Sequence, residues 1–389
     1  MPRHSSSTAV RLAAFYAAFF AVIGTLQPFW PLWLAWKGLN ATEIGLVLAI
    51  GIGAKVIGLP LAAHVADRRG ERKRPMLALS SASIFAFALF ALAQGYWTLV
   101  LVSLLFFSLW PPVMSLGESL TIRAAHQGAF QYGRVRLWGS LAYIVAALAA
   151  GGILARASAD AVFWLIMGGV ALTALACWQL PDIRIERSLS RALPLVETLR
   201  RPAFVLMLSA CGLIQGSHAV YYAFGTIHWR TVGYSEDIIG ALWAEGVICE
   251  VALFAFGATA IRRCGAGGLI VLAGFAAAVR WAGTGLTDAL PAIVVMQALH
   301  GISFGAAHLG AMHYIGQHVP LALSATAQSL YSAIVFGLFL GVMLYGAGWL
   351  YQMLAGAAYL PMAVAGIMGA GLAWPLLRHE RGDRSVPDQ

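Results

Sequence analysis

The feature that most constrains this chain is the alternation of long apolar stretches with short polar loops. About twelve such stretches occur along its 389 residues. A helix of roughly 20 apolar residues spans the ~30 Å hydrocarbon core of a bilayer. With 60% hydrophobic and only 11% charged residues, the chain is far more apolar than a soluble domain of its size. The pattern predicts an all-α membrane protein with twelve transmembrane helices.

The apolar stretches divide into two sets of six. The first set is expected at residues 11–36, 43–66, 75–94, 97–122, 134–155 and 160–180, and the second at 203–229, 236–261, 267–287, 290–316, 323–349 and 357–377. The predicted organisation is therefore an N-terminal six-helix half (1–180), a polar cytoplasmic linker (181–202), a C-terminal six-helix half (203–377) and a cytoplasmic tail (378–389). Two halves of six helices are expected of a transporter whose substrate binds near the bilayer midplane.

Basic residues indicate which loops face the cytoplasm. Twenty of the 25 Lys and Arg residues fall on alternate loops, on the 181–202 stretch and on the two chain ends, whereas Lys37, Arg156 and Arg230 fall on the opposite side. By the positive-inside rule both termini are cytoplasmic, and the expected location is the inner membrane. The net charge of +9 then reflects topology and contact with anionic lipids, so nucleic acid is not an expected partner.

Ionisable residues inside the apolar stretches are candidates for function, because a charge near the bilayer centre is costly unless it faces a cavity or a partner. They are Lys55 in the second stretch, Glu118 in the fourth, His218 in the seventh, Glu245 and Glu250 in the eighth, Arg280 in the ninth, and His300 and His308 in the tenth. The two histidines of the tenth stretch are expected on one face of its helix, whereas Glu245 and Glu250 are expected to point about 140° apart.

Two buried cations and many aromatic residues suit a small anion with an aromatic or apolar body. Lys55 or Arg280 would bind the carboxylate of such a molecule. Aromatic side chains would hold its body. The rings expected to do so are those of Phe29, Trp30, Tyr221, Tyr222 and Phe304.

Several short motifs resemble a known family. They are Gly24–Leu34, Ala66–Lys73, Tyr132–Ser140, Gln215–Tyr222, Val279–Trp281, and Leu299–Phe304 with His308. The second motif, in which Asp67 and Gly70 are accompanied by basic residues, resembles the signature loop of the major facilitator superfamily. The third resembles the lactose permease-like branch, and the whole set resembles the 3-phenylpropionic acid transporter group of that branch. The resemblance implies the major facilitator fold and secondary transport by alternating access.

The resemblance also implies roles for individual residues. By analogy with the lactose permease, Glu118 and Arg136 form a substrate-binding pair; the alternative is that Arg136 lies at the membrane interface as a topogenic charge. Glu245, Arg280 and His300 align with the permease's functional residues in helices 8, 9 and 10.

The chain departs from the permease at two positions of the tenth stretch. Gln297 stands where the permease has a lysine, and Ser303 stands where it has its proton-linked glutamate. A symporter with this sequence must therefore bind its proton elsewhere. The candidates are Glu250, Glu245 and His308. Arg280 is the expected partner of Glu250, and an ion pair with a purely structural role is the alternative.

The loop after the second stretch has an expected mechanical role. Asp67 would pair with nearby arginines and with the ends of neighbouring helices, and so lock the outward-facing state. The residues assigned to this gate are Asp67, Arg68, Gly70 and Arg72.

The predicted function is proton-coupled symport of a small aromatic carboxylate by a monomer that needs no cofactor. Import of a nucleoside or sugar, with Glu118 and Arg136 as the clamp, is one alternative, and drug efflux by proton antiport is another. An enzyme is not expected, because the sequence has no metal-ligand spacing, no Gly-rich phosphate loop and no nucleophile elbow. The short tails and the lack of an appended soluble domain argue against a sensor or an assembly factor.

Overall fold

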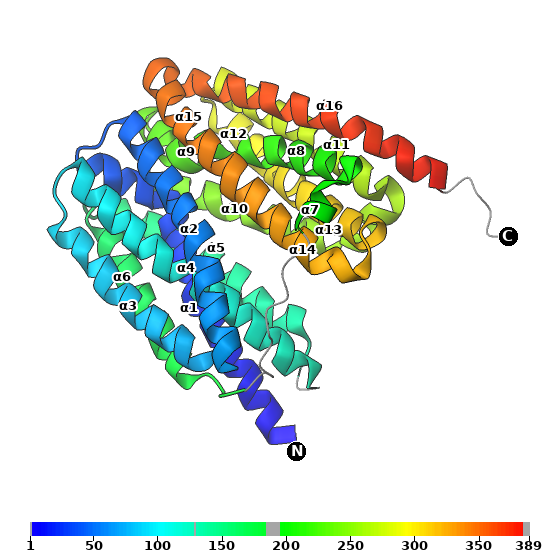
Figure 1. Ribbon diagram of the computed structural model, residues 1–389. Helices are drawn as coiled ribbons and strands as arrows, with labels where there is room; N and C mark the ends of the chain where they lie inside the picture. Colours follow the sequence, from blue (N-terminus) through cyan, green and yellow to red (C-terminus); the bar gives the residue numbers. More distant parts are fainter. Residues whose placement is uncertain (1, 128–129, 184–194, 384–389) are drawn as a thin grey trace. The chain divides into compact units, whose positions relative to one another are not determined.

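The computed structural model describes residues 2–127, 130–183 and 195–383, and in these ranges the chain forms helices and no strand (Figure 1). The first helices are α1 (Pro2–Trp36), α2 (Ala41–Arg69), α3 (Lys73–Leu92), α4 (Tyr96–His126), α5 (Tyr132–Leu154) and α6 (Ala161–Gln179). They are followed by α7 (Leu195–Leu199), α8 (Pro202–Gly216), α9 (Ala219–Thr231), α10 (Glu236–Ala255), α11 (Gly257–Leu286) and α12 (Leu290–Ala298). The last part comprises the π-helix η1 (Gly301–Ala306), α13 (Ala307–His318), α14 (Leu321–Tyr331), the π-helix η2 (Ser332–Phe339), α15 (Leu340–Leu354), the 3-10 turn η3 (Ala355–Ala358) and α16 (Tyr359–Asp383).

Eleven helical stretches of the described chain are long and apolar enough to cross a membrane, and the last of them, Thr326–Leu377, has 52 residues. A straight helix of that length would measure about 78 Å, more than twice the bilayer core. The chain instead turns at Ala355, whose φ of 47° ends α15, and α16 begins four residues later. This stretch is therefore a hairpin with two crossings, and the prediction of twelve transmembrane helices is confirmed.

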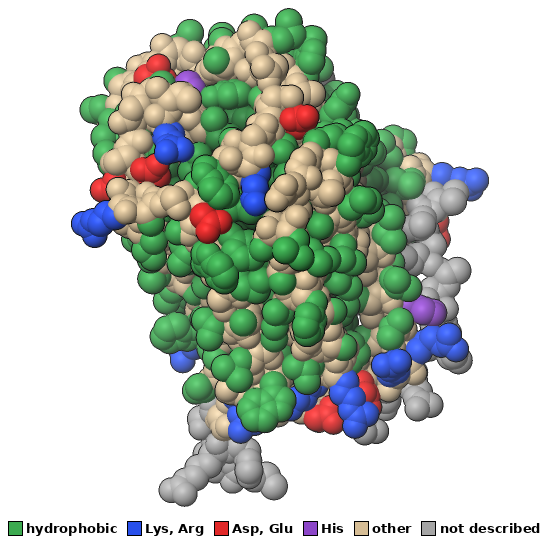
Figure 2. All heavy atoms as spheres, turned by 90° about the vertical axis from the view of Figure 1, so that its left-hand side faces the viewer, with side chains coloured by type: hydrophobic (Ala, Val, Ile, Leu, Met, Phe, Trp, Pro, Cys, Tyr) green, Lys and Arg blue, Asp and Glu red, His purple; other side chains and the backbone are tan. Residues whose placement is uncertain are grey.

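Hydrophobic side chains also cover the outside of the protein, as a bilayer requires. On the face in Figure 2 they occupy the middle, while Lys, Arg, Asp and Glu gather toward its two ends. Large exposed side chains include Phe85 and Trp97, each more than 70% accessible. Apolar surface of this extent is stable in lipid and would aggregate in water.

The described helices form two compact units. One comprises residues 1–191 and 233–244, and the other comprises residues 192–232 and 245–389, so that α10 begins in the first unit and ends in the second. The boundaries at 180 and 203 stay a prediction, and residues 184–194 of the predicted linker and 384–389 of the predicted tail lie outside the described residues.

In the first unit, α1 packs on α5 and α6, and α4 packs on α2 and α3. Small residues permit these contacts. A side chain at Gly58 of α2 would meet the backbone carbonyl of Ser108 in α4, and one at Gly24 of α1 would come within 2.5 Å of the carbonyl oxygen of Tyr143 in α5. Close backbone approach through glycine is typical of membrane helices, because packing rather than the hydrophobic effect joins them.

In the second unit, three crossings are interrupted along their length. The first consists of α8 and α9, separated at Ser217 and His218, the second of α12, η1 and α13, and the third of α14, η2 and α15. π-helical segments are rare and occur often at functional sites. The end of α10 differs from the sequence prediction, which extended it to residue 261. α10 ends at Ala255, and residues 257–264 join α11 through Gly265, whose φ of 72° suits glycine.

Candidate functional site

Arg280 of α11 lies at the centre of a polar cluster inside the second unit. Its side chain is 0% exposed. The guanidinium carbon lies 4.2 Å from the ring centre of Trp281 and 4.6 Å from that of Tyr221. Desolvated cation–π contacts of this kind are each worth about 2 kcal/mol. They offset part of the cost of burying the charge, and they leave the edges of the guanidinium for hydrogen bonds.

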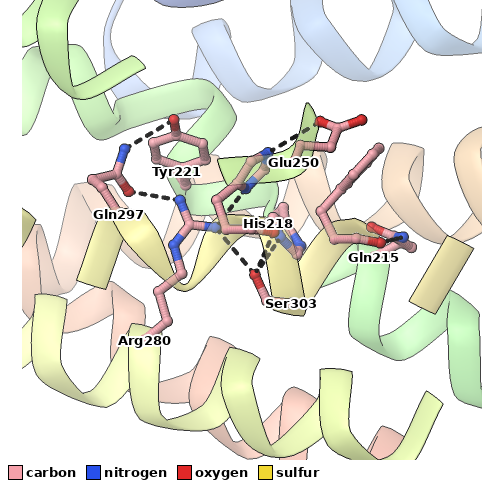
Figure 3. Close-up of polar contacts among 9 residues, drawn as sticks. Gln215, His218, Tyr221, Glu250, Arg280, Gln297 and Ser303 are labelled. Carbon is pink, nitrogen blue, oxygen red and sulfur yellow. Dashed lines mark hydrogen bonds and ion pairs between the residues drawn. The ribbon is translucent and has the colours of Figure 1, made fainter. Parts of the chain in front are cut away.

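The side chains that Arg280 contacts by hydrogen bonds lack a negative charge. Nη2 donates to Oε1 of Gln297 at 2.6 Å, and Nη1 donates to Nδ1 of His300 at 2.8 Å and more weakly to Oγ of Ser303 at 3.4 Å (Figure 3). Nε is buried and has no hydrogen-bond partner among the residues that the structure describes. The Nε–H of the cation is thus buried without a partner among these residues.

These contacts determine the tautomer of His300 and one hydrogen-bond role of His218. Arginine only donates, so Nδ1 of His300 must accept, and its proton is on Nε2. The His300 imidazole is therefore neutral in this arrangement. Nδ1 of His218 lies 3.1 Å from the carbonyl oxygen of Ile214 and must donate to it, and its Nε2 lies 3.4 Å from Oγ of Ser303.

Glu250 approaches the cluster through His300. Oε2 of Glu250 lies 3.9 Å from Nε2 of His300, the nitrogen that carries the proton. The ring of His300 therefore links the predicted partners Glu250 and Arg280, with one nitrogen facing each of them. Glu245, the other predicted acid, is half-buried on the same helix.

Glycines of η1 and α10 make this approach possible. A side chain at Gly301 would come within 2.5 Å of the carbonyl oxygen of Cys249, and one at Gly246 would lie 3.2 Å from the His300 ring. The π-helix is also tied to α8, because Nε2 of Gln215 donates to the carbonyl of Phe304 at 3.0 Å. Small residues and this side-chain hydrogen bond thus accompany the local geometry around His300.

The remaining predicted residues of this unit surround the cluster. Tyr221 accepts a hydrogen bond from Nε2 of Gln297 at 3.1 Å, and the ring centre of Tyr222 lies 5.6 Å from that of His218. His308 lies farther along the same crossing, where Nδ1 is 3.4 Å from Oη of Tyr331. No group of three or more His, Cys, Asp or Glu in the described ranges could hold a metal ion.

The first unit brings together the predicted pair of Glu118 and Arg136. Nε of Arg136 lies 3.5 Å from Oε1 of Glu118, and the two side chains are 30% and 40% exposed. The guanidinium carbon lies 4.2 Å from the ring centre of Phe20, and Tyr132 donates to Glu118 at 3.5 Å. The geometry fits the pair that the resemblance implied, and its role in binding stays a prediction.

Three further residues were predicted to contact the substrate, and each has its own surroundings. They are Lys55, Phe29 and Trp30. Lys55 is half-buried on α2 and has no hydrogen-bond or ion-pair partner in the described part of the chain. Phe29 is fully buried. Trp30 stacks on Trp33 at 4.6 Å and meets the edge of Phe90 at 4.7 Å in the aromatic core of the first unit. Contact of these three residues with a substrate stays a prediction.

The residues of the predicted gate lie where α2 ends and α3 begins. Gly70 ends α2 with a φ of 65°, and the turn brings the side chain of Arg72 back to the carboxylate of Asp67. Arg72 also donates from Nε to Oγ of Ser119 in α4 at 3.2 Å. Arg68 is exposed. The ion pair thus ties the loop to α4, and its effect on transport stays a prediction.

Comparison with known proteins identifies the family of this chain. The model of the MFS_1 like family matches residues 9–360. The chain belongs to this family of major facilitator proteins. It is 33% identical over 364 residues to a probable 3-phenylpropionic acid transporter of Escherichia coli, covering 92% of this chain and 94% of the relative. A maltose permease of Geobacillus stearothermophilus is 26% identical and covers 94% of each chain.

A solved structure agrees with the fold. The nucleoside transporter NupG superposes with a TM-score of 0.81 over 96% of this chain and 98% of that one, at 14% identity. Such low identity supports the fold alone. Together with the family match, it makes this MFS_1 like protein a multi-pass membrane protein and a secondary transporter.

Sequence reasoning on this MFS_1 like chain did not assign Gln297, Ser303, Gln215 or Trp281 to the site. Buried amides and hydroxyls are harder to find than charges, because apolar helices contain many of them as packing residues. The signal that pointed to Gln297 and Ser303 was their departure from the permease pattern. Only the contacts with Arg280 show what those two residues do.

Proposed function

We propose that the protein is a proton-coupled symporter of a small aromatic carboxylate. The observation that carries this proposal is the buried Arg280, whose hydrogen-bond partners are uncharged and whose Nε–H is unpaired. A buried ion costs several kcal/mol unless an opposite charge with good geometry compensates it. A substrate carboxylate supplies that charge, and arginine binds it more specifically than lysine because its planar fork matches the two oxygens.

The surroundings of Arg280 favour an aromatic or apolar body attached to that carboxylate. Tyr221, Trp281, His218 and Phe304 have ring centres within 6.0 Å of one or more of the others. Such rings form edge and stacking contacts with an aromatic ligand. The 33% identity to a probable 3-phenylpropionic acid transporter supports the same class of substrate.

Glu250 is the proposed proton site, with Glu245 and His308 as the further candidates. His300 lies between Glu250 and Arg280, 3.9 Å from the Glu250 carboxylate and hydrogen-bonded to the Arg280 guanidinium. A proton on Glu250 and an anion at Arg280 would therefore act on opposite sides of the same imidazole. Taking up both leaves the net charge of the cluster unchanged. The loaded protein can then change conformation without carrying extra charge through the bilayer.

Further roles complete the proposal. Lys55 would bind the anion at another stage of transport, and the pair of Asp67 and Arg72 would stabilise one conformation. On the basis of the basic loops, we place both termini in the cytoplasm and the protein in the inner membrane. We propose that it acts there as a monomer.

A neutral sugar or nucleoside is the second candidate. It is favoured by the pair of Glu118 and Arg136, which is partly exposed and offers both an acceptor and a donor to hydroxyl groups. The 26% identity to a maltose permease agrees with this reading. Competition separates the two candidates, since a neutral nucleoside or sugar that blocks uptake where 3-phenylpropionate does not would favour the second.

The test is uptake of radiolabelled 3-phenylpropionate into proteoliposomes with and without an inward proton gradient. The protonated acid crosses lipid unaided, so proteoliposomes containing Arg280→Gln are the matched control. Gradient-dependent uptake above that control is the expected result. Uptake by both folded proteins at the rate of protein-free liposomes would reject the aromatic carboxylate as substrate, whereas equal uptake above that rate would reject Arg280 as its binding residue.

A further inference from the structure

Gln297 of α12 is a buried amide that both contacts and orients Arg280. It is 1% exposed. Its Oε1 accepts from Nη2 of Arg280 at 2.6 Å, and its Nε2 donates to Oη of Tyr221 at 3.1 Å (Figure 3). Arginine only donates, so the oxygen end of the amide must face the guanidinium. Tyr221 holds the other end, and its ring also lies 4.6 Å from the guanidinium carbon.

This arrangement fixes the cation without neutralising it. Gln297 accepts from one N–H of Nη2, and His300 and Ser303 accept from Nη1. Nε on the remaining edge is left unpaired and buried. A glutamate has nearly the same shape as glutamine and could make the same contact. It would, however, place a full negative charge beside the guanidinium and form an internal ion pair.

We infer that Gln297 is the residue that sets the charge selectivity of the site. As a positioning residue, it holds Arg280 through an uncharged acceptor, so that the positive charge is available to an anionic substrate. Tyr221 supports it by fixing the direction of the amide. This inference rests on the proposed function, because it assumes that Arg280 binds the substrate carboxylate.

The experiment is isothermal titration of the purified full-length protein with 3-phenylpropionate and with its uncharged amide, 3-phenylpropanamide. In Gln297→Glu, affinity for the carboxylate should fall about 30-fold or more, as expected when a charge partner is withdrawn from a ligand. Affinity for the amide should be retained.

Gln297→Met is the matched neutral variant. It keeps the length of the side chain but loses the acceptor, so affinity for 3-phenylpropionate should fall about tenfold, the equivalent of one hydrogen bond to a charged group. Its preference for the carboxylate over the amide should remain. A variant that only damaged the fold would lose affinity for both probes and melt at a lower temperature.

The outcomes separate this inference from the proposed function. If the wild type binds no 3-phenylpropionate, the proposed function fails. If the wild type binds it and Arg280→Gln does not, while Gln297→Glu binds as tightly as the wild type, the proposed function stands and the inference is wrong. If Gln297→Glu does not fold, Gln297→Met decides, because wild-type affinity in that variant would show that position 297 does not position Arg280.

Discussion

Replacing Arg280 by Gln should weaken substrate binding without destabilising the protein. A fully buried side chain with three hydrogen bonds would ordinarily be expected to matter for folding. Here the charge itself is costly, because its bonded partners are neutral and its Nε–H is unpaired. Glutamine removes that charge and keeps a polar side chain, although the shorter chain gives up the bonds made by Nη1 and Nη2.

The expected change in the free energy of unfolding is the sum of two opposing contributions. Losing the hydrogen bonds and the cation–π contacts costs several kcal/mol, and removing the buried charge returns an amount of similar size. The free energy of unfolding should therefore change little. Substrate binding has no such compensation. Truncating one partner of a buried charge pair costs about 2–5 kcal/mol, which raises Kd by roughly 30- to 4,000-fold.

The assay combines equilibrium binding of radiolabelled 3-phenylpropionate with thermal unfolding of the same purified protein. Arg280→Lys is the matched control, since it keeps the charge but loses the planar fork, and it should show an intermediate Kd. An unchanged Kd in Arg280→Gln would refute the reasoning. So would a large fall in melting temperature together with the loss of binding, because Arg280 would then be a structural residue.

Other substitutions test separate parts of the account. Glu250→Gln should retain substrate binding and exchange but abolish accumulation driven by a proton gradient, and gradient-driven accumulation at the wild-type level would exclude this residue as the proton site. Lys55→Gln should abolish uptake while expression stays normal, and a wild-type rate would remove it from the transport pathway. Asp67→Asn should shift the accessibility of engineered cysteines to a labelling reagent without changing substrate preference, whereas an unchanged labelling pattern would contradict a gating role. Gly58→Ala should lower the melting temperature, because the added methyl meets a backbone carbonyl of α4, whereas Gly53→Ala on the same helix meets nothing within 4 Å and should not.

Hydropathy was enough to predict the twelve crossings, because each stretch must match the thickness of the bilayer. It could not predict the interruptions inside them. The break at Ser217 and the π-helix at Gly301–Ala306 occur within apolar runs, and they depend on contacts with other helices. The end of α10 was misplaced for a similar reason, since the helix is broken at Phe256 although the chain is helical on both sides of that residue.

The site was predictable where a charge stood in an apolar helix. Arg280, Glu250 and His300 were all identified in this way, and the structure places them in one cluster. The sequence did not reveal their arrangement in space, in which His300 lies between Glu250 and Arg280. It also gave no indication that Trp30 stacks within an aromatic core, because a tryptophan beside a kinked helix suits a cavity and a core equally well.

The most direct test of coupled transport is to record the internal pH of proteoliposomes when 3-phenylpropionate is added outside. Symport predicts that the wild-type protein acidifies the lumen faster than Arg280→Gln and faster than protein-free liposomes, which report passive entry of the acid. It also predicts that the excess rate saturates with substrate concentration. Acidification at the protein-free rate, by wild-type protein that binds 3-phenylpropionate, would contradict proton-coupled symport of this substrate.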